Sequence, residues 1–330
     1  MLSETMDVIL PLGYKSWETA RFDASDEDNG INIKSWPVFG IYQPDAIRTI
    51  EHNGHSYLVT ANEGGAKNYI HPNGIQESIL VSNIIISEKS PVMRWANQHN
   101  VSGIQEKQNL GRLEISSLHG KNIDGSYRAL YAFGGRGFSI WQLDSMDLVY
   151  DSGSQFEDMH RLYFSSLFNV DGGKNAKTVK ETFDSRSDNK GPECESIAVA
   201  YIGDMILLFI GSERPGSIAI YKIEHDVAKP KFQSIWMGIE DTDGTWEQLY
   251  EKRKLSEIDP EDVRYISPDD SPTGDHMLLV AGTVSGTLSL FRINGIPYHL
   301  RKSPSNTAEG IQSVIPVTIL FVIIYYWLHI

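Results

Sequence analysis

Acidic side chains in two parts of this sequence suit the binding of a hard cation. The first part is residues 23–30, where Asp23, Asp26 and Asp28 offer carboxylate oxygens, of which Ca²⁺ binds about six to eight. The segment is not an EF-hand loop, because a loop with Gly30 at its sixth position has Trp36 rather than glutamate at its twelfth. The alternative to ion binding is a solvated loop that forms turns.

The second group of acids borders short apolar runs. A proline–acid pair precedes three of these runs, at Asp45, Glu193 and Glu261. If each run is a strand that starts beside a common axis, the acids must crowd together and be neutralised by a cation, by arginines or by protonation. The candidate metal ligands there are Glu63, Glu193, Glu195 and Glu213. The competing interpretation is a salt-bridge network in which Arg186 and Arg214 neutralise the acids.

The sequence offers little support for catalysis. It contains no Gly-x-Ser-x-Gly elbow, no phosphate-binding loop and no His-Glu-x-x-His motif, and its ten histidines show no ligand spacing. Cys194 is the single cysteine, so no intramolecular disulfide can form, and its two glutamate neighbours disfavour the thiolate. We therefore predict no catalytic residue and no cofactor other than Ca²⁺. The alternative is a calcium-dependent phosphoesterase.

The elements that must position these acids are predicted to be β-hairpins. Residues 131–143, 208–223 and 279–293 each hold an apolar run, a glycine-containing turn and an alternating strand. Residues 57–64 repeat the first half of this unit before a long polar insertion. With the strand that follows each proline–acid pair, the unit makes most of a four-stranded blade, which predicts an all-β β-propeller. A sandwich of irregular hairpins is the alternative.

Insertions and chain length limit the number of blades. Residues 67–125 and 156–191 are polar, and residues 245–254 are the one segment that predicts a short helix. About four or five blades of roughly 40–50 residues fit the chain. We therefore expect residues 1–295 to form a partial propeller, the C-terminal part of a larger one whose N-terminal blades are missing.

Composition excludes one class of partner. The 330 residues include 29 Lys and Arg against 43 Asp and Glu, and this net charge of −14 argues against nucleic-acid binding through a basic surface. Hydrophobic residues make up 41% of the chain, enough for a folded protein with a substantial core. The composition therefore predicts an acidic folded protein that does not bind nucleic acid.

The two ends of the sequence bear on location. Residues 296–313 are a polar linker, and residues 314–330 form an apolar run at the lower length limit for a membrane-spanning helix. Small residues, a spacer and an apolar tail are typical of a GPI-attachment signal, with Asn306 as the preferred site, and a short tail anchor is the alternative. Residues 1–10 lack a signal peptide, so we expect a partial sequence. Asn100 begins an Asn-Val-Ser glycosylation sequon.

Six collinear blocks carry a family resemblance: residues 9–15, 23–33, 36–47, 57–64, 148–154 and 184–193. Through them the chain resembles the mesenchyme-specific cell-surface glycoprotein family and its choice-of-anchor I relatives. The resemblance implies a β-propeller ectodomain, which in the animal members is held on the outer leaflet of the plasma membrane by a GPI anchor. It also implies a role in biomineralisation, with calcium, calcium mineral or extracellular matrix as partners.

The chain also departs from the family pattern. Residues 65–67 are Gly-Ala-Lys where the family tends to have an acidic residue and an arginine. Residues 259–262 and 281–283 replace the family's Gly-Pro-Glu-Gly and Ala-Asn-Glu. These differences favour a divergent member with an altered site. The function expected from residues and resemblance together is an acidic, non-catalytic cell-surface glycoprotein.

Overall fold

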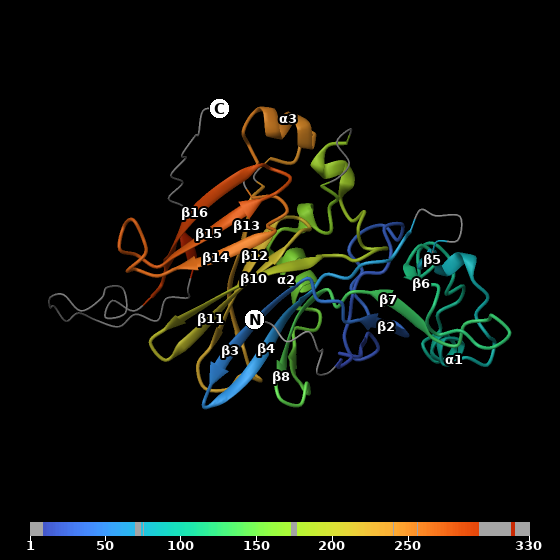
Figure 1. Cartoon of the computed structure of the whole chain (residues 1–330). Coiled ribbons are helices and arrows are strands. Elements are labelled where there is room, and N and C mark those ends of the chain that lie inside the picture. Colours follow the sequence, from blue (N-terminus) through green and yellow to red (C-terminus); the bar gives the residue numbers. More distant parts are fainter. Residues whose placement is uncertain are drawn as a thin grey trace.

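The computed structural model describes residues 9–69, 74, 76–172, 177–239, 241–255, 257–296 and 318–320. The described chain forms four β-sheets with a few short helices, which confirms the all-β prediction (Figure 1). The sheet β10–β13 lies in the middle, with the sheet β14–β17 on one side of it and the sheet of β3, β4, β8 and β9 on the other.

Three of the sheets are antiparallel, with four strands in chain order. The first consists of β3 (Ala46–His52), β4 (His55–Asn62), β8 (Gly137–Gln142) and β9 (Leu148–Asp151). The second consists of β10 (Cys194–Ile202), β11 (Met205–Ser212), β12 (Ser217–Ile223) and β13 (Lys231–Met237). The third consists of β14 (Asp262–Ile266), β15 (Met277–Gly282), β16 (Thr287–Asn294) and β17 (Thr318–Leu320).

The middle sheet is buried on both faces, and the side chains of β11 show why. Successive residues of a strand point to opposite faces of its sheet. Leu208 and Ile210 accordingly lie in the core shared with β3, β4 and β8, whereas Leu207 and Phe209 lie in the core shared with β14, β15 and β16. A continuous apolar run is therefore needed here, and burial of each such side chain contributes about 1.5–3 kcal/mol.

The fourth sheet is mixed and stands apart from this stack. Its strands are, in order, β1 (Tyr14–Ser16), β2 (Val38–Ile41), β7 (Leu130–Phe133), β6 (Glu114–Ser116) and β5 (Ser78–Leu80), with β2 and β7 parallel. It shares a core with helix α1 (Pro91–Gln98), and the 3-10 turn η1 (Val81–Asn83) lies after β5. Ser90 caps α1 by accepting a hydrogen bond from the Met93 N–H at 3.1 Å.

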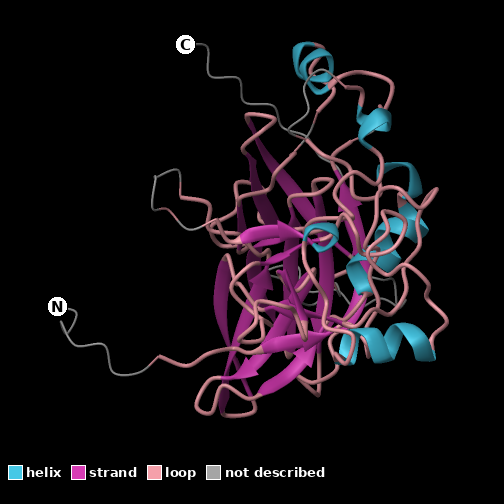
Figure 2. Ribbon diagram, turned by 90° about the vertical axis from the view of Figure 1, so that its right-hand side faces the viewer, coloured by secondary structure: helices cyan, strands magenta, loops and turns pink. Residues whose placement is uncertain are grey.

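The remaining helices lie within residues 155–182 and 246–251. They are α2 (Gln155–Tyr163), η2 (Ser165–Leu167), η3 (Val179–Thr182) and α3 (Trp246–Glu251). The helix expected within residues 245–254 is confirmed, and its Thr245 and Gln248 form a capping box. The prediction that this is the one helical segment is wrong, because α1 and α2 are helices as well. Figure 2 shows the helices gathered along one side of the molecule. Among the described residues, no helix has the length and hydrophobicity needed to span a bilayer.

Two of the three predicted hairpins are confirmed, as β11–β12 and β15–β16, and the third is wrong. Within residues 131–143, β7 pairs with β2 and β6, whereas β8 pairs with β4 and β9. The intervening glycines therefore lead from one sheet to another. A Cβ atom on Gly134, whose φ is +76°, would lie 2.2 Å from the carbonyl oxygen of Glu63, so only glycine fits this crossing.

The blade prediction is met in part. Strands β3, β10 and β14 follow the proline–acid pairs as expected, and each starts a four-stranded antiparallel sheet. The described residues hold three such sheets rather than four or five, because the chain from β4 to β8 builds part of the mixed sheet instead. Asn306, the linker after residue 296 and the apolar tail except for residues 318–320 lie outside the described residues.

Candidate functional site

The acids predicted to converge lie at one end of the three antiparallel sheets. Glu193 precedes β10, Glu213 follows β11 and Glu63 follows β4. In an antiparallel pair the start of one strand neighbours the end of the next, and β10 also contacts β3, β4 and β14 of the flanking sheets. One oxygen from each of Glu63, Glu193 and Glu213 lies within 4.8 Å of the others, and so does one from each of Glu195, Glu213 and Asp259. We call all five residues the acidic cluster.

A β-bulge brings Glu195 into the acidic cluster. Cys194 pairs with Ser212 and Ser196 pairs with Gly211, so Glu195 has no partner in the ladder between β10 and β11. A bulge of this kind redirects a side chain that would otherwise follow the alternation of the strand. The residue is 4% exposed, and its Oε1 has no hydrogen-bond partner within the described part of the chain.

Unusual backbone geometry holds two further members in place. Glu193 has a φ of +51° and Asp259 a φ of +62°, a region that costs a residue other than glycine about 1–3 kcal/mol. The Asp259 carbonyl accepts hydrogen bonds from the Glu261 N–H at 2.9 Å and from the Thr283 N–H at 3.0 Å. The Ser196 hydroxyl donates to the Pro260 carbonyl and so ties the start of β10 to the segment before β14.

Cations neutralise one half of the acidic cluster. Glu193 receives the Arg186 guanidinium at 2.6 Å and the Lys190 ammonium at 2.7 Å. Lys190 also pairs with Glu63, and Arg214 pairs with Glu213. Burial acts to raise the pKa of Glu193, but the charges of its basic neighbours outweigh it and hold the pKa at about 2. Glu63 and Glu193 therefore belong to a salt-bridge network, the competing interpretation of the sequence.

The other half of the acidic cluster carries excess negative charge. Burial, together with the charges of Asp259 and Glu213, raises the pKa of Glu195 to about 11. Burial and the charge of Glu193 raise the pKa of Glu213 to about 8, and burial also raises the pKa of Asp259. Arg214 pairs with Glu213 but leaves two further acids beside it, and acids crowded in this way must take up protons or bind a cation. Their oxygens and the orphaned Glu195 Oε1 fit a hard cation such as Ca²⁺.

The proline–acid pairs approach one another as predicted. Burial and then the charges of Glu193 and Asp45 act to raise the pKa of Glu63. Burial and then the charges of Asp259, Asp45 and Glu63 act to raise the pKa of Glu261. The sequence missed Asp259 as a cluster member. The available signal was its position directly before Pro260, next to the proline–acid pair of Pro260 and Glu261.

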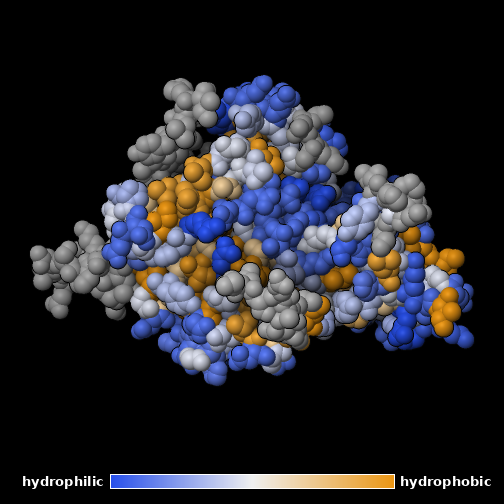
Figure 3. All heavy atoms as spheres, in the orientation of Figure 1, coloured by the Kyte–Doolittle hydropathy of each residue, from blue (hydrophilic) through white to orange (hydrophobic). Residues whose placement is uncertain are grey.

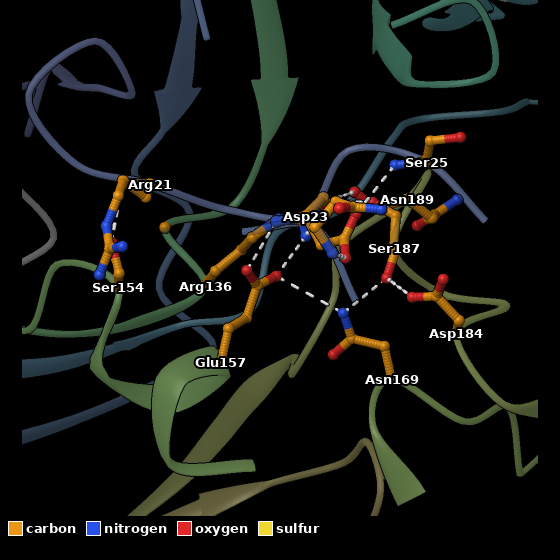
Figure 4. Close-up of polar contacts among 12 residues, drawn as sticks. Arg21, Asp23, Ser25, Arg136, Ser154, Glu157, Asn169, Asp184, Ser187 and Asn189 are labelled. Carbon is orange, nitrogen blue, oxygen red and sulfur yellow. Dashed lines mark hydrogen bonds and ion pairs between the residues drawn. The ribbon is translucent and has the colours of Figure 1, made fainter. Parts of the chain in front are cut away.

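The acidic segment of residues 23–30 is organised differently: Asp26 faces Arg112, whereas Asp23 and Asp28 both accept hydrogen bonds from Asn32. Asp23 is fully buried and accepts hydrogen bonds from the backbone N–H groups of Ser25 and Asn32 (Figure 4). Asp26 pairs with Arg112, while Asp28 is half-buried and its pKa is raised by burial. Ion binding by this loop stays a prediction, since no described group of three ligand atoms within 4.8 Å includes it.

Asp23 belongs to a buried network that the sequence did not predict. Glu157 accepts from the Asp23 N–H at 2.8 Å and from Arg136 at 2.6 Å. Asp184 also lies here and accepts a hydrogen bond from Ser187 at 2.5 Å (Figure 4). Burial, with the charges of the neighbouring acids, raises the pKa of Asp23 to about 7 and that of Asp184 to about 8. Within this network the Arg136 guanidinium pairs with Glu157 and also donates to the backbone carbonyl oxygen of Asp23 at 2.9 Å.

The candidate glycosylation site and an apolar region both lie on the surface of the protein. Asn100 is exposed just after α1, with a φ of +56°, so its side chain is accessible for modification. Apolar side chains gather over β14 to β16, and hydrophilic ones gather near the middle of the same face (Figure 3). The outward residue Leu288 on β16 is 66% exposed.

Comparison with known proteins places these features in context. The family model of the choice-of-anchor I domain matches residues 1–226. Gigasin-3a of Magallana gigas is 41% identical over 204 residues, which cover 62% of this chain and 72% of that protein. The mesenchyme-specific cell surface glycoprotein of Strongylocentrotus purpuratus is 28% identical over 341 aligned positions, which cover 97% of this chain but 40% of that protein. No solved structure matches.

Proposed function

This chain belongs to the choice-of-anchor I domain family, and from that premise we propose that it is a non-catalytic cell-surface protein that binds Ca²⁺ through its acidic cluster. The relative from S. purpuratus is named as a cell surface glycoprotein, which supports the location. A net charge of −14 adds a field that concentrates cations around the whole protein.

One observation carries the calcium proposal, the buried Glu195 oxygen without a hydrogen-bond partner. Leaving such a group unsatisfied costs about 1–3 kcal/mol, and more if it is charged. Glu213 and Asp259 each bring an oxygen within 4.8 Å of one from Glu195. A divalent cation held by these three acids would satisfy the orphaned oxygen and offset the mutual repulsion. Lys190 and Arg186 already satisfy the neighbouring Glu193.

Calcium titration of the protein tests this site. The unmodified chain, stripped with EDTA, should bind Ca²⁺ in calorimetry and unfold at a higher temperature with the ion present. Glu195→Gln and Asp259→Asn should each weaken Ca²⁺ binding by about tenfold or more, since each removes a charged ligand. Asp204→Asn is the matched control, because Asp204 is exposed at the opposite end of the β10–β11 pair. Equal affinity in all variants, or no calcium response in the unmodified chain, would refute the site.

The β-propeller is part of the same proposal. Support comes from the three four-stranded antiparallel sheets, each introduced by a proline–acid pair, and from the contacts of β10 with β3 and β14. In that arrangement the acidic cluster lies where the first strands of neighbouring blades meet. A crystal structure of a full-length relative with these sheets arranged around one axis would support it, and a sandwich would contradict it.

Anchoring and biological role extend the proposal further. The small polar residues before the apolar run support a GPI anchor at Asn306 on the outer leaflet of the plasma membrane. Phospholipase C should release the full-length protein from cells, and retention would instead support a tail anchor. We propose calcium mineral or extracellular matrix as the partner, so Glu195→Gln should also reduce retention on calcium carbonate.

The alternative is a calcium-dependent phosphoesterase, and the geometry of the basic residues disfavours it. A phosphate group needs free cations, but Arg186, Lys190 and Arg214 are each paired with a carboxylate. Phosphate release from a generic ester, measured with and without Ca²⁺, should stay at the uncatalysed rate. Clear turnover that Glu193→Ala abolishes would favour the enzyme.

A further inference from the structure

A cavity of about 510 Å³ lies where α1 begins beside strands β2 and β7. Figure 1 shows these strands together on the side of the molecule that carries the mixed sheet, with α1 below them. Phe39 and Tyr131 line the cavity from the two strands, and Pro91 lines it from α1. Lys121, Arg128 and Glu18 complete its polar rim.

The rings of Phe39 and Tyr131 stack on each other at the cavity wall, and we call this partly exposed pair the aromatic shelf. The two residues are register partners on parallel strands, and their ring centroids lie 5.2 Å apart at an interplanar angle of 26°. Tyr14 extends the shelf, with its ring 4.7 Å from that of Tyr131, and remains 48% exposed. The negative face of such a ring attracts the weakly positive C–H groups on one face of a pyranose.

Two cations stand beside this shelf without acidic partners in the described chain. Lys121 and Arg128 are both exposed, and the described ion pairs do not include either of them. The Lys121 ammonium lies 5.3 Å from the centroid of the Tyr127 ring, a cation–π contact that positions it. On a chain with 43 acids, cations that remain available beside a cavity attract anionic groups.

The backbone is shaped to form this wall. Gly120 has a φ of +81°, and a Cβ atom there would lie 2.1 Å from the Ala129 carbonyl oxygen and 3.2 Å from the Tyr131 ring. The Gly120 carbonyl accepts the Arg128 N–H at 2.8 Å. The segments that carry Lys121 and Arg128 therefore approach closely over Tyr131, which only glycine allows.

We propose that this cavity binds an anionic glycan, a sugar chain that bears sulfate or carboxylate groups. The pyranose would pack on the exposed part of the aromatic shelf, Lys121 and Arg128 would pair with the anionic groups, and Glu18 would accept hydrogen bonds from sugar hydroxyls. A neutral sugar would leave the two cations unused, and a small inorganic anion would leave the shelf uncovered. This inference goes beyond the proposed function and does not depend on ion binding by the acidic cluster.

The test uses a heparin-derived hexasaccharide with the full chain in EDTA, so that calcium bridging is excluded. Maltohexaose and the de-sulfated hexasaccharide are the neutral and weakly charged comparisons. Arg128→Ala and Lys121→Ala should each weaken hexasaccharide binding by about fivefold to tenfold, and higher salt should weaken it further. Lys180→Ala is the control, because Lys180 is an exposed lysine on η3, which does not line the cavity.

The aromatic shelf needs its own pair of variants. Tyr131→Phe should bind like the unmodified chain because it keeps the ring, whereas Tyr131→Ala should lose tenfold or more. Thermal unfolding of each variant separates loss of the shelf from loss of the fold. The proposal is overturned if Lys180→Ala weakens binding as much as Arg128→Ala, if Tyr131→Ala folds and binds normally, if the three saccharides bind equally, or if a sulfated peptide binds more tightly than the hexasaccharide.

Discussion

Asp184→Asn should remove part of the pH dependence of stability. Asp184 is 3% exposed, and burial with the charge of Asp23 raises its pKa to about 8 from an ordinary value of 3.8. The folded protein therefore holds a proton here that the unfolded chain releases. A raised folded pKa means that the stability contribution is complete below pH 3.8 and is lost as the pH rises through 8.

The size of the effect follows from linkage. Each pH unit between the two pKa values changes the free energy of unfolding by about 1.4 kcal/mol per group. Between pH 5 and pH 8 a single group would lose at most about 4 kcal/mol, and coupling to Asp23 reduces this to about 2–3 kcal/mol. Asparagine keeps the oxygen that accepts from Ser187 and cannot become charged. The variant should match the unmodified chain at pH 5 and exceed it by about 2 kcal/mol at pH 9.

Urea unfolding at pH 5 and pH 9, with EDTA present, measures this difference. Asp144→Asn is the control, because Asp144 is exposed and the substitution changes the net charge by the same amount. The comparison between variants removes the contributions of Glu195 and Glu213, which titrate in the same direction. An Asp184→Asn variant with the same slope against pH as the Asp144→Asn control would refute the reasoning.

Three other predictions concern single residues. Lys190→Met should lower the free energy of unfolding by about 3–5 kcal/mol in urea, since it leaves Glu193 and Glu63 short of a cation; a loss below 1 kcal/mol would mean that water reaches them. Leu208→Ala should cost about 2–5 kcal/mol, because Leu208 is fully buried between two sheets, and an unchanged midpoint would contradict that burial. Cys194 should react with a thiol reagent only on unfolding, because burial raises its pKa to about 12; rapid labelling of the native protein would show local opening.

The sequence predicted the local parts of the structure well. Period-2 alternation and glycine turns identified the β11–β12 and β15–β16 hairpins, and proline–acid pairs marked the starts of β3, β10 and β14. The failure at residues 131–143 has a definite cause. Its two strands are adjacent in sequence and look like a hairpin, but pairing partners at distant positions in the chain place them in different sheets.

By itself, the sequence determined that this is an acidic all-β chain whose carboxylates gather at strand ends, because strand periodicity and turn residues are local properties. Only the tertiary structure decided how those carboxylates divide. It placed Lys190 between Glu63 and Glu193, buried Glu195 through a bulge and added Asp259 to the acidic cluster. It also placed Asp184 beside Asp23 in a separate network. The physical reason is that charge neutralisation depends on distance and burial, which are fixed by contacts between residues far apart in the chain.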